Sequence, residues 1–570
     1  MCPQKVQATV ALSPALTQRN CVKNLSSGLP IRFLYWIIAL MPTSPLKLDS
    51  PPATGSSLVV SASSLTVNLP RPPRLFYRHG WQSWSLAAWT EPTPLPIQRP
   101  AILHPLQVDP HYAKELSLHS SWVGAVEFED DDILLLGSLG LNAHVWLKGN
   151  QLQCQHETDG CEWFIARGDE SSIFAKYAEE LGKRFGKRSD KPTPRVWCSW
   201  YSLYTAIDEA ILFRVFDELG DLPFAVLQVD DGWQMSIGDW EANKKFPSGM
   251  NALADKIKST GRKAGLWLAP LIAVKSSRLF RGHPEWFLRD TNGKFASAGF
   301  NWGEQLYALD ATHPETIKWL ASLMKQVRAW GFDYLKLDVL YAGALPAKRF
   351  ADMPREAAYR QALKTMREAM GGDAYFLACG APILPSLGLC DALRVGPDVS
   401  DKWEDARDAT FLYNFTTPGA RNAVRTTVSR LWLQPLVTTD SDVVYFTEKE
   451  NLLSPEHKLL LQDLASICNF KATSDLPQWM RPTTRESLRG FLTALPQVKR
   501  ISRATFQIDD RVVDFSSALA LPPPPRGLTK LPATFMGWLG NQPSALKLFN
   551  RLNEAGFKKK RQRAEIELSQ

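Results

Sequence analysis

At 570 residues the chain is too long for one ordinary hydrophobic core, so two or three domains are expected. Apolar residues make up 45% and charged residues 22%, which is the composition of a globular protein. The net charge of +8 comes partly from the basic stretch 558–563, which we interpret as a solvated tail and not as a nucleic-acid-binding patch, because no aromatic residues are interleaved with it.

The eight cysteines are scattered along the chain, and none of them forms a C-x-x-C pair. This spacing favours neither a zinc site nor a disulfide framework. We therefore expect a reduced, cytoplasmic protein without a metal or another cofactor.

The N-terminal residues 1–45 are expected to be a poorly ordered extension or the product of a mistaken upstream start, with Met41 as the true initiator. The apolar run 33–41 has nine residues, which is too short to span a bilayer. Basic residues precede the run, as in a signal peptide, but no small-residue cleavage site follows it. No membrane association is expected.

Residues 46–190 contain short β-rich runs separated by Gly, Asn, Asp and Pro, which predicts a β-sandwich. The most unusual loop in this part is R-H-G-W-Q-S-W-S at 78–85. Its two tryptophans, Trp81 and Trp84, suit either corners of the core or a lid over a neighbouring domain, and the sequence leaves both interpretations open.

Residues 191–480 alternate between strands and helices. Expected strands are 196–201, 224–229, 264–269, 332–344, 375–379, 392–395, 436–439 and 469–472. Expected helices are 207–219, 251–259, 314–330, 354–370, 421–433 and 459–468, with an irregular insertion at about 275–308. Polar residues repeatedly follow the strands, which is typical of a (β/α)₈ TIM barrel with its active face at the carboxyl ends of the strands. A small antiparallel β-domain is expected at 481–550, with strands at 505–508 and 512–515, and 551–570 is the basic tail.

The stretch 332–344, F-D-Y-L-K-L-D-V-L-Y-A-G-A, reads as a strand that is buried on both faces. Lys336 and Asp338 interrupt it at alternate positions, so both point to the same side. A buried carboxylate without a partner costs several kcal/mol, so a core built only for stability would not contain one. One interpretation is a Lys–Asp pair that holds the strand in register; the other is a catalytic carboxylate at a strand end.

Asp398 follows the strand 392–395, two strands beyond Asp338 in the expected barrel. Backbones two strands apart are separated by roughly 9–10 Å. Side chains that lean inward reduce the gap to about 5–7 Å, which overlaps the separation of the two carboxyl groups in a retaining glycosidase. The alternative is a pair of aspartates that cap strand ends, since Asp398 after Gly-Pro would suit an Asx-turn.

Several segments in order along 190–480 resemble the α-galactosidases of glycoside hydrolase family 36, especially the compact bacterial and archaeal type. The matching motifs are W-C-S-W-Y (197–201), Q-V-D-D-G-W (228–233), I-G-D-W (237–240), G-L-W-L-A-P (265–270), Y-A-L-D (307–310), Y-L-K-L-D-V-L-Y-A-G-A (334–344), A-C-G-A-P (378–382) and L-R-V-G-P-D (393–398). The loop W-Q-S-W at 81–84 extends the resemblance into the N-terminal domain. Residues after about 485 show no motif of the family.

The resemblance implies a role for each acid that matches. Asp338 corresponds to the catalytic nucleophile and Asp398 to the general acid/base of a retaining mechanism that uses no metal. Asp230 and Asp231 correspond to the acids that bind the axial 4-hydroxyl and the 6-hydroxyl of galactose. Carboxylates at a strand end are acceptors that suit donating hydroxyls.

The remaining matches are cationic, apolar or sulfur-containing. Lys336 and Arg394 correspond to cations near the 2- and 3-hydroxyls of the sugar, and each would keep a neighbouring aspartate ionised. Trp267 corresponds to an apolar wall of the pocket and Cys379 to a residue near the 2-position. Weaker candidates for the pocket are Trp81, Trp84 and Trp200.

The resemblance therefore implies a retaining exo-α-galactosidase that acts on α-galactosides of the melibiose or raffinose type. A galactosyltransferase similar to raffinose synthase would share the same carboxylates, and a catalytically inactive carbohydrate-binding barrel would share the fold. The sequence leaves the natural glycoside and the oligomeric state open.

Overall fold

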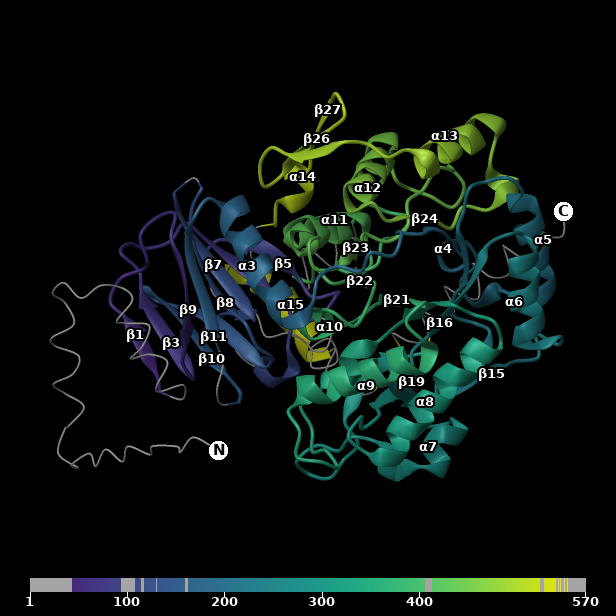
Figure 1. Cartoon of the computed structure of the whole chain (residues 1–570), viewed down its shortest axis with the longest axis horizontal. Coiled ribbons are helices and arrows are strands. Elements are labelled where there is room, and N and C mark those ends of the chain that lie inside the picture. Colours follow the sequence, from purple (N-terminus) through teal and green to yellow (C-terminus); the bar gives the residue numbers. More distant parts are fainter. Residues whose placement is uncertain are drawn as a thin grey trace, which may run out of the picture.

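The computed structural model describes residues 44–93, 108–113, 117–129, 131–158, 162–404, 413–522 and 527–539, with single positions as far as 551. The expected extension 1–45 and the tail 551–570 therefore lie almost entirely outside the described residues. Figure 1 shows a β-rich part beside a larger part in which strands and helices alternate, with a small C-terminal sheet at the top of the view. The predicted fold class, a β-sandwich, a (β/α)₈ barrel and a small antiparallel sheet, is confirmed.

The N-terminal part consists of two mainly antiparallel sheets. One has the order β1 (Leu46–Leu48), β3 (Ser64–Asn68), β10 (Gln151–His156), β9 (Ala143–Lys148) and β6 (Leu118–Ser121). The other has the order β2 (Ser57–Ser61), β11 (Glu162–Gly168), β8 (Asp132–Ser138), β7 (Val123–Glu129), β4 (Leu75–His79) and β5 (Ala87–Thr90). Along β3, Leu65 and Val67 are buried and Thr66 between them is partly exposed, because successive side chains of a strand point to opposite faces.

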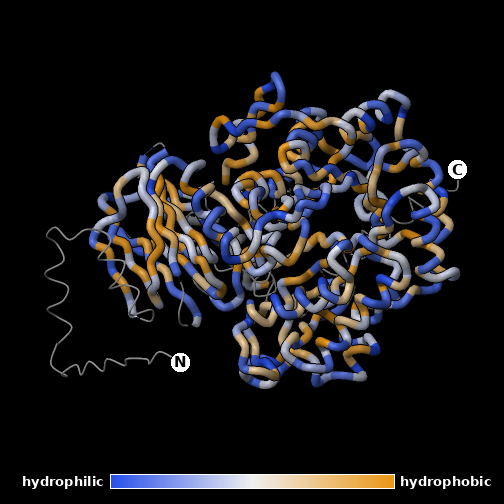
Figure 2. Tube along the Cα trace, viewed as in Figure 1, coloured by the Kyte–Doolittle hydropathy of each residue, from blue (hydrophilic) through white to orange (hydrophobic). Residues whose placement is uncertain are grey.

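Helix α3 (Glu170–Phe185) covers the outer face of the six-stranded sheet and leads the chain toward the barrel. It begins at Asp169, whose side chain accepts a hydrogen bond from the backbone amide of Ser172 at 2.9 Å. A Cβ atom at Gly137 of β8 would lie 2.5 Å from the ring of Tyr177, so only glycine permits this close approach. Strand β8 is covered on both faces, which explains its continuous apolar run. The strands around it are largely orange, that is hydrophobic, in Figure 2.

The barrel consists of eight parallel strands. They are β12 (Arg195–Cys198), β13 (Val226–Val229), β16 (Lys263–Leu268), β20 (Tyr334–Leu337), β21 (Tyr375–Ala378), β22 (Ala392–Arg394), β23 (Thr438–Asp440) and β24 (Lys471–Thr473). Neighbours in the sheet follow the chain order, and β24 pairs with β12. Between β23 and β24, the pairing among the described residues is a single bridge from Val444 to Thr473. All eight predicted strands are present, with ends that differ by a few residues.

The predicted helices are also present. They are α5 (Glu209–Leu219), α6 (Gly249–Ser259), α8 (Pro314–Ala329), α9 (Arg355–Met370), α11 (Ala420–Ser429) and α12 (Pro455–Cys468). Short elements at the strand ends are α4 (Trp200–Leu203), η3 (Tyr204–Ala206), β14 (Gln234–Ser236), β15 (Asp239–Ala242), η5 (Leu340–Ala344), α10 (Ile383–Ser386), η7 (Leu431–Leu433) and η8 (Pro477–Trp479). Helix α8 begins after His313, whose ring accepts a hydrogen bond from the amide of Glu315, and Gly331 follows it with a φ of 103°.

The insertion at about 275–308 is more regular than the sequence predicted. It contains α7 (Arg278–Gly282) and η4 (Pro284–Trp286). It also provides β18 (Ser297–Asn301) and β19 (Glu304–Ala308), which form a sheet with β17 (Ile272–Val274). These strands were missed because they are short and interrupted by glycines. Trp302 and Gly303 form the turn of the β18–β19 hairpin, and both have a positive φ.

The C-terminal part contains the predicted antiparallel sheet, in the order β25 (Val498–Arg500), β26 (Thr505–Ile508) and β27 (Arg511–Asp514). Helices accompany the sheet: α13 (Pro482–Thr493), α14 (Ser516–Leu519), η9 (Gly527–Thr529) and α15 (Lys530–Leu539). The sequence did not predict these helices. The sheet contacts the sandwich, because Arg503 pairs with Glu127 and Glu170.

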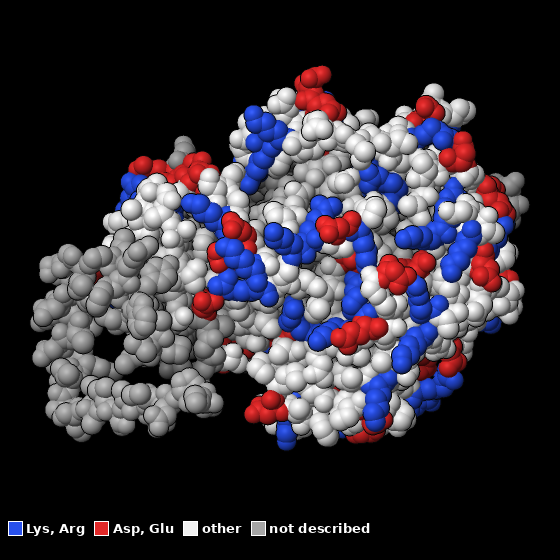
Figure 3. Space-filling model, viewed as in Figure 1, with Lys and Arg blue, Asp and Glu red and all other residues white. Residues whose placement is uncertain are grey.

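The surface charges and the length of the helices were compared with what binding to nucleic acid or insertion into a membrane would require. Figure 3 shows basic and acidic side chains interspersed over the visible face of the barrel. Such mixing differs from the single-sign stripe typical of a nucleic-acid-binding surface. No helix among the described residues has the length and apolar character needed to cross a membrane.

A buried arginine joins the sandwich to the barrel. Arg355, at the start of α9, binds Asp109 at 2.5 and 2.9 Å and Glu157 at 2.7 and 3.1 Å. The next residue, Glu356, accepts hydrogen bonds from the indole of Trp122 at 3.0 Å and the amide of Asn142 at 2.6 Å. Two successive side chains of one barrel helix therefore satisfy buried polar groups of the sandwich.

The first prediction concerns this junction. Arg355→Met should lower the free energy of unfolding by about 3–5 kcal/mol, because it leaves two carboxylates without their cation. The measurement is the shift of the first unfolding transition in urea. The matched control is Arg328→Met, which breaks the more exposed pair with Asp373 and should cost about 0–1 kcal/mol. Equal losses in the two variants would contradict the role of Arg355.

Candidate active site

The carboxyl ends of the barrel strands carry a cluster of charged side chains. Its members are Asp230 and Asp231 after β13, Lys336 in β20, Asp338 after β20, Arg394 in β22, Asp398 after β22, Asp440 in β23 and Asp442 after β23. Most of them are buried, whereas Asp338 and Asp398 are partly exposed. These two carboxyl groups are therefore the members of the cluster that a substrate can reach most readily.

Asp338 is held by donors on both of its oxygens. The indole of Trp267 donates to Oδ2 at 2.9 Å, and the backbone amide of Val339 donates to Oδ1 at 2.7 Å. Val339 has a φ of 53°, a left-handed conformation that is strained for a β-branched residue. The strained turn directs an amide at the carboxylate, and both donors stabilise its ionised form.

Lys336 and Asp230 form a buried ion pair of 3.0 Å between neighbouring strands. Asp230 also accepts a hydrogen bond from Gln228 at 2.6 Å. Burial disfavours the charged form of Lys336, but the charges of Asp230 and Asp338 hold its pKa well above the ordinary value. Lys336 therefore stays cationic between the two aspartates.

Asp231 accepts hydrogen bonds from two side chains. The indole of Trp302 donates at 2.7 Å, and the amide of Gln234 donates at 2.6 Å. Burial raises the pKa of Asp231, and both donors oppose the shift. Trp302 also lies 6.1 Å from Trp267, measured between ring centroids. The sequence analysis missed Trp302; the signal that could have revealed it is the N-W-G turn at 301–303.

Arg394 binds three carboxylates. Its guanidinium donates to Asp398 at 2.9 Å, to Asp440 at 2.7 Å and to Asp442 at 2.8 Å. Burial raises the pKa of Asp398 to about 7; Arg394 opposes this shift and the charge of Asp442 adds to it. Asp440 and Asp442 are among the polar residues found at the ends of the strands, and the sequence did not predict their contacts with Arg394.

The remaining predicted residues lie around this cluster. Cys379 is buried after β21, where burial and the charge of Asp338 raise the pKa of its thiol. Trp200 begins α4 and is partly exposed, with its ring centroid 5.1 Å from that of Tyr204. Trp84 is partly buried with its indole against Gly380, whereas Trp81 is fully buried in the core.

The loop 80–85 of the sandwich reaches the barrel at the end of β21. The amide of Ser83 donates to the carbonyl of Ala381 at 3.0 Å, and Gln82 forms a bridge with Pro382. Arg430, fully buried, donates to the carbonyls of Gly80, Gln82, Ser83 and Val395 at 2.7–3.1 Å. The sequence left open whether the tryptophans of this loop are core residues or a lid over a neighbouring domain. Each interpretation holds for one of them: Trp81 is a core residue, and Trp84 lies over the end of a barrel strand.

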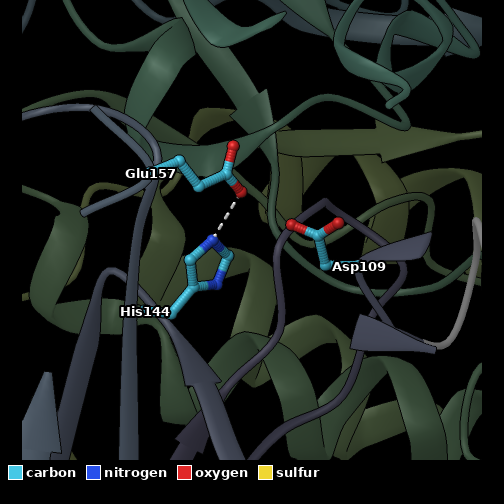
Figure 4. A group of neighbouring side chains, drawn as sticks. All are labelled: Asp109, His144 and Glu157. Atoms are coloured by element: carbon cyan, nitrogen blue, oxygen red, sulfur yellow. Dashed lines mark hydrogen bonds and ion pairs between the residues drawn. The ribbon is translucent and has the colours of Figure 1, made fainter. Parts of the chain in front are cut away.

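One group among the described residues could bring three metal ligands together. Figure 4 shows Asp109, His144 and Glu157, whose ligand atoms lie within 4.8 Å of one another. His144 binds Glu157 at 2.9 Å, and Arg355 already binds both carboxylates. The guanidinium supplies the positive charge that a metal would bring, so this group is better suited to joining the sandwich and the barrel than to holding an ion.

Comparisons with known proteins relate this chain to α-galactosidases. A family model described as Melibiase matches residues 171–367. A solved structure of an α-galactosidase from Thermus thermophilus, in complex with p-nitrophenyl α-D-galactopyranoside, is 45% identical with a TM-score of 0.77, covering 83% of this chain and 96% of that one. A family 36 α-galactosidase from Geobacillus stearothermophilus shares the fold at 16% identity, with a TM-score of 0.52, covering 77% of this chain and 63% of that one.

Curated relatives match over shorter segments. An α-galactosidase of Geobacillus stearothermophilus is 26% identical over 197 residues, which are 32% of this chain and 26% of that protein. α-Galactosidase 1 of Pediococcus pentosaceus is 30% identical over 174 residues, 27% of this chain and 23% of that protein. The chain thus aligns with about a quarter of the length of these relatives.

The fold and the site define a barrel of the glycoside hydrolase class. The chain belongs to the melibiase family of α-galactosidases, glycoside hydrolase family 36.

The second prediction concerns Arg430. Arg430→Met should lower the free energy of unfolding by about 3 kcal/mol or more, because it leaves several buried carbonyls without donors. Urea unfolding measures this change. Arg278→Met, at an exposed arginine paired with Glu241, is the control and should change stability little. An equally small change at Arg430 would show that the loop 80–85 is held by other contacts.

Proposed function

We propose that this protein is a retaining exo-α-galactosidase that removes terminal α-linked galactose from oligosaccharides by double displacement. One observation carries the proposal: Asp338 and Asp398, at the ends of β20 and β22, are partly exposed carboxyl groups in opposite electrostatic environments. Asp338 accepts hydrogen bonds that favour a carboxylate, whereas the pKa of Asp398 is raised to about 7. A carboxylate beside a carboxylic acid is the pair that a glycosidase needs.

The proposed reaction has two steps. Asp338 attacks the anomeric carbon and forms a β-galactosyl ester, while Asp398 gives its proton to the leaving glycosidic oxygen. Asp398, now a carboxylate, takes a proton from water as the water attacks the anomeric carbon. The ester bond to Asp338 breaks, α-galactose leaves, and both side chains return to their starting forms.

The buried charges around this pair suit the recognition of galactose. We assign Asp230 and Asp231 to the 4- and 6-hydroxyls, because carboxylates accept from hydroxyl donors. Lys336 and Arg394 are assigned to the neighbourhood of the 2- and 3-hydroxyls. The indole of Trp267 forms an apolar wall, and Cys379 lies near the 2-position.

Complexes of relatives support the choice of substrate. The α-galactosidase from Thermus thermophilus was solved with p-nitrophenyl α-galactoside and with stachyose, and a Geobacillus stearothermophilus relative was solved with raffinose. We infer that this protein acts on α-galactosides of the melibiose, raffinose and stachyose type. We also place it in the cytoplasm, because the five described cysteines are free and buried.

The third prediction concerns sugar selectivity. A gluco-configured substrate would leave a buried carboxylate, Asp230 or Asp231, without its hydroxyl. An unmet partner of this kind can reduce kcat/KM by roughly 10⁴-fold. The measurement is hydrolysis of p-nitrophenyl α-galactoside beside the matching α-glucoside, β-galactoside and N-acetyl-α-galactosaminide. Comparable rates on the α-glucoside would overturn the assignment.

The fourth prediction separates the two catalytic carboxyl groups. Asp338→Gly should reduce the rate by roughly 10³–10⁵-fold, or about 4–7 kcal/mol of barrier, because the nucleophile is lost. Added azide should occupy the space, attack from the opposite face in one step and give β-galactosyl azide. Nuclear magnetic resonance of the product identifies the anomer.

Asp398→Gly is the matched variant. It should spare the first step for aryl substrates with good leaving groups, and the ester intermediate should accumulate. Azide should then attack the ester with overall retention and give the α-azide. An α-azide from the Asp338 variant, or a β-azide from the Asp398 variant, would mean that the roles are reversed or that the site lies elsewhere.

A further inference from the structure

Asp442 has an unusual position for a residue without an assigned role. It is fully buried just after β23, and its φ of 78° is a strained left-handed conformation. Its backbone amide donates to Asp440 at 2.7 Å, which holds the turn. Both the burial of a charge and the strained backbone cost free energy, and such strained residues concentrate at functional sites.

The carboxylate of Asp442 is fully occupied by donors. Oδ1 accepts from Arg394 and from the amide of Val443, both at 2.8 Å. Oδ2 accepts from the amide of Val399 at 3.0 Å and from the hydroxyl of Tyr201. Val399 directly follows Asp398, so Asp442 holds the backbone of the loop that presents the acid/base.

Asp398 itself has far fewer donors. Among the described residues its carboxyl group accepts one hydrogen bond, from Arg394, and its side chain is 33% exposed. Other charged and titratable groups face it from the surrounding elements. They are Lys336 and Asp338 of the β20 end, Cys379 after β21, Asp440 and Asp442 of the β23 end, and Tyr201 of α4.

The charges decide which carboxyl group carries a proton. Arg394 is a single cation shared by Asp398, Asp440 and Asp442, so one of these carboxylates is favoured to bind a proton. Four donors stabilise the ionised form of Asp442, and one stabilises that of Asp398. Burial raises the pKa of Asp442 as well, but its four donors oppose that shift. The difference in donors therefore favours the proton on Asp398, whose pKa burial raises to about 7.

We propose that Asp442 is a positioning residue of this site: its carboxylate fixes the Asp398 loop through the Val399 amide, and its negative charge on the shared guanidinium keeps Asp398 protonated for the first step. This proposal rests on the proposed function. It assigns Asp442 no contact with the substrate. Its effect passes through Asp398 and therefore depends on the leaving group and on pH.

The test is the pH dependence of kcat/KM in the wild type and in Asp442→Asn. The first step requires protonated Asp398, so the wild-type rate on melibiose should fall as the pH rises through about 7. Asp442→Asn removes the charge, so this alkaline limb should move down by about one pH unit or more. A shift of the pKa from about 7 to about 5 would lower the protonated fraction at pH 7 by roughly 50-fold.

The leaving group separates this role from a merely structural one. Asp442→Asn should reduce kcat/KM at pH 7 by roughly tenfold more on melibiose than on p-nitrophenyl α-galactoside, whose leaving group departs without a proton. An equal loss on both substrates with an unmoved limb would overturn the proposal. The control is Asp391→Asn, which changes a buried aspartate before β22 that binds Arg367. It should affect stability and leave the alkaline limb in place.

A second variant keeps the proposal testable if Asp442→Asn does not fold. Asp442→Glu retains the charge but moves the carboxylate away from Val399. Its alkaline limb should stay within about 0.3 unit of the wild type, while kcat/KM on melibiose falls about tenfold or more. An alkaline limb that moves to lower pH would contradict the proposed effect of the Asp442 charge on Asp398. A kcat/KM equal to that of the wild type would contradict the proposed positioning of the Asp398 loop.

A readout without substrate distinguishes this inference from the proposed function. Carbodiimide couples an amine to a protonated carboxyl group, and peptide mass analysis gives the extent of coupling at Asp398 as a function of pH. Coupling at Asp398 should decline near pH 7 in the wild type and at lower pH in Asp442→Asn. The same profile in both proteins would overturn the inference, whereas inactivity of the wild type on α-galactosides would overturn the function alone.

Discussion

The Arg394 guanidinium is the positive charge that three carboxylates share at the catalytic end of the barrel, and the geometry of that end depends on it. Each of its bonds reaches a different aspartate, at 2.7–2.9 Å. A lysine would donate all of its hydrogen bonds from one nitrogen atom, whereas the guanidinium presents its donors from three nitrogens in one rigid plane. Without Arg394, the buried carboxylates of Asp440 and Asp442 would lose the cation that pairs with them, at a cost of several kcal/mol. The same requirement explains Lys336, which neutralises Asp230.

The sandwich contributes a loop to the end of the barrel where the charged cluster lies. Its loop 80–85 meets the end of β21, and Arg430 binds the carbonyls of that loop together with the carbonyl of Val395, which directly follows Arg394. Arg355 forms a second junction with the sandwich at α9. These contacts are buried and hydrogen-bonded, so the position of the loop is coupled to the barrel strands beneath it. The sandwich therefore helps to fix the residues around Asp398, in addition to burying its own core.

The barrel was predictable from the sequence because buried parallel strands read as continuous apolar runs, as in 332–344, and because helices between them carry clear starts and ends. The charged residues at strand ends were visible as interruptions of those runs. Trp302 was missed because its turn lies in an insertion without periodicity, and its contact with Asp231 crosses about 70 residues of chain. The role of Asp442 was also invisible, since hydrogen bonds from Tyr201, Val399 and Arg394 converge on it only in three dimensions.

The protonation states at this site follow from a balance of charges and donors. The cluster holds two cations, Lys336 and Arg394, and a larger set of acids: Asp230, Asp231, Asp338, Asp398, Asp440 and Asp442. A surplus of buried carboxylates raises proton affinity, and the proton binds where the ionised form has the fewest donors. Asp338 has the Trp267 indole and the Val339 amide, whereas Asp398 has Arg394 alone among the described residues. Asp338, with two donors on its oxygens, therefore suits the role of nucleophile that we propose for it, and Asp398, whose pKa burial raises to about 7, suits that of acid/base.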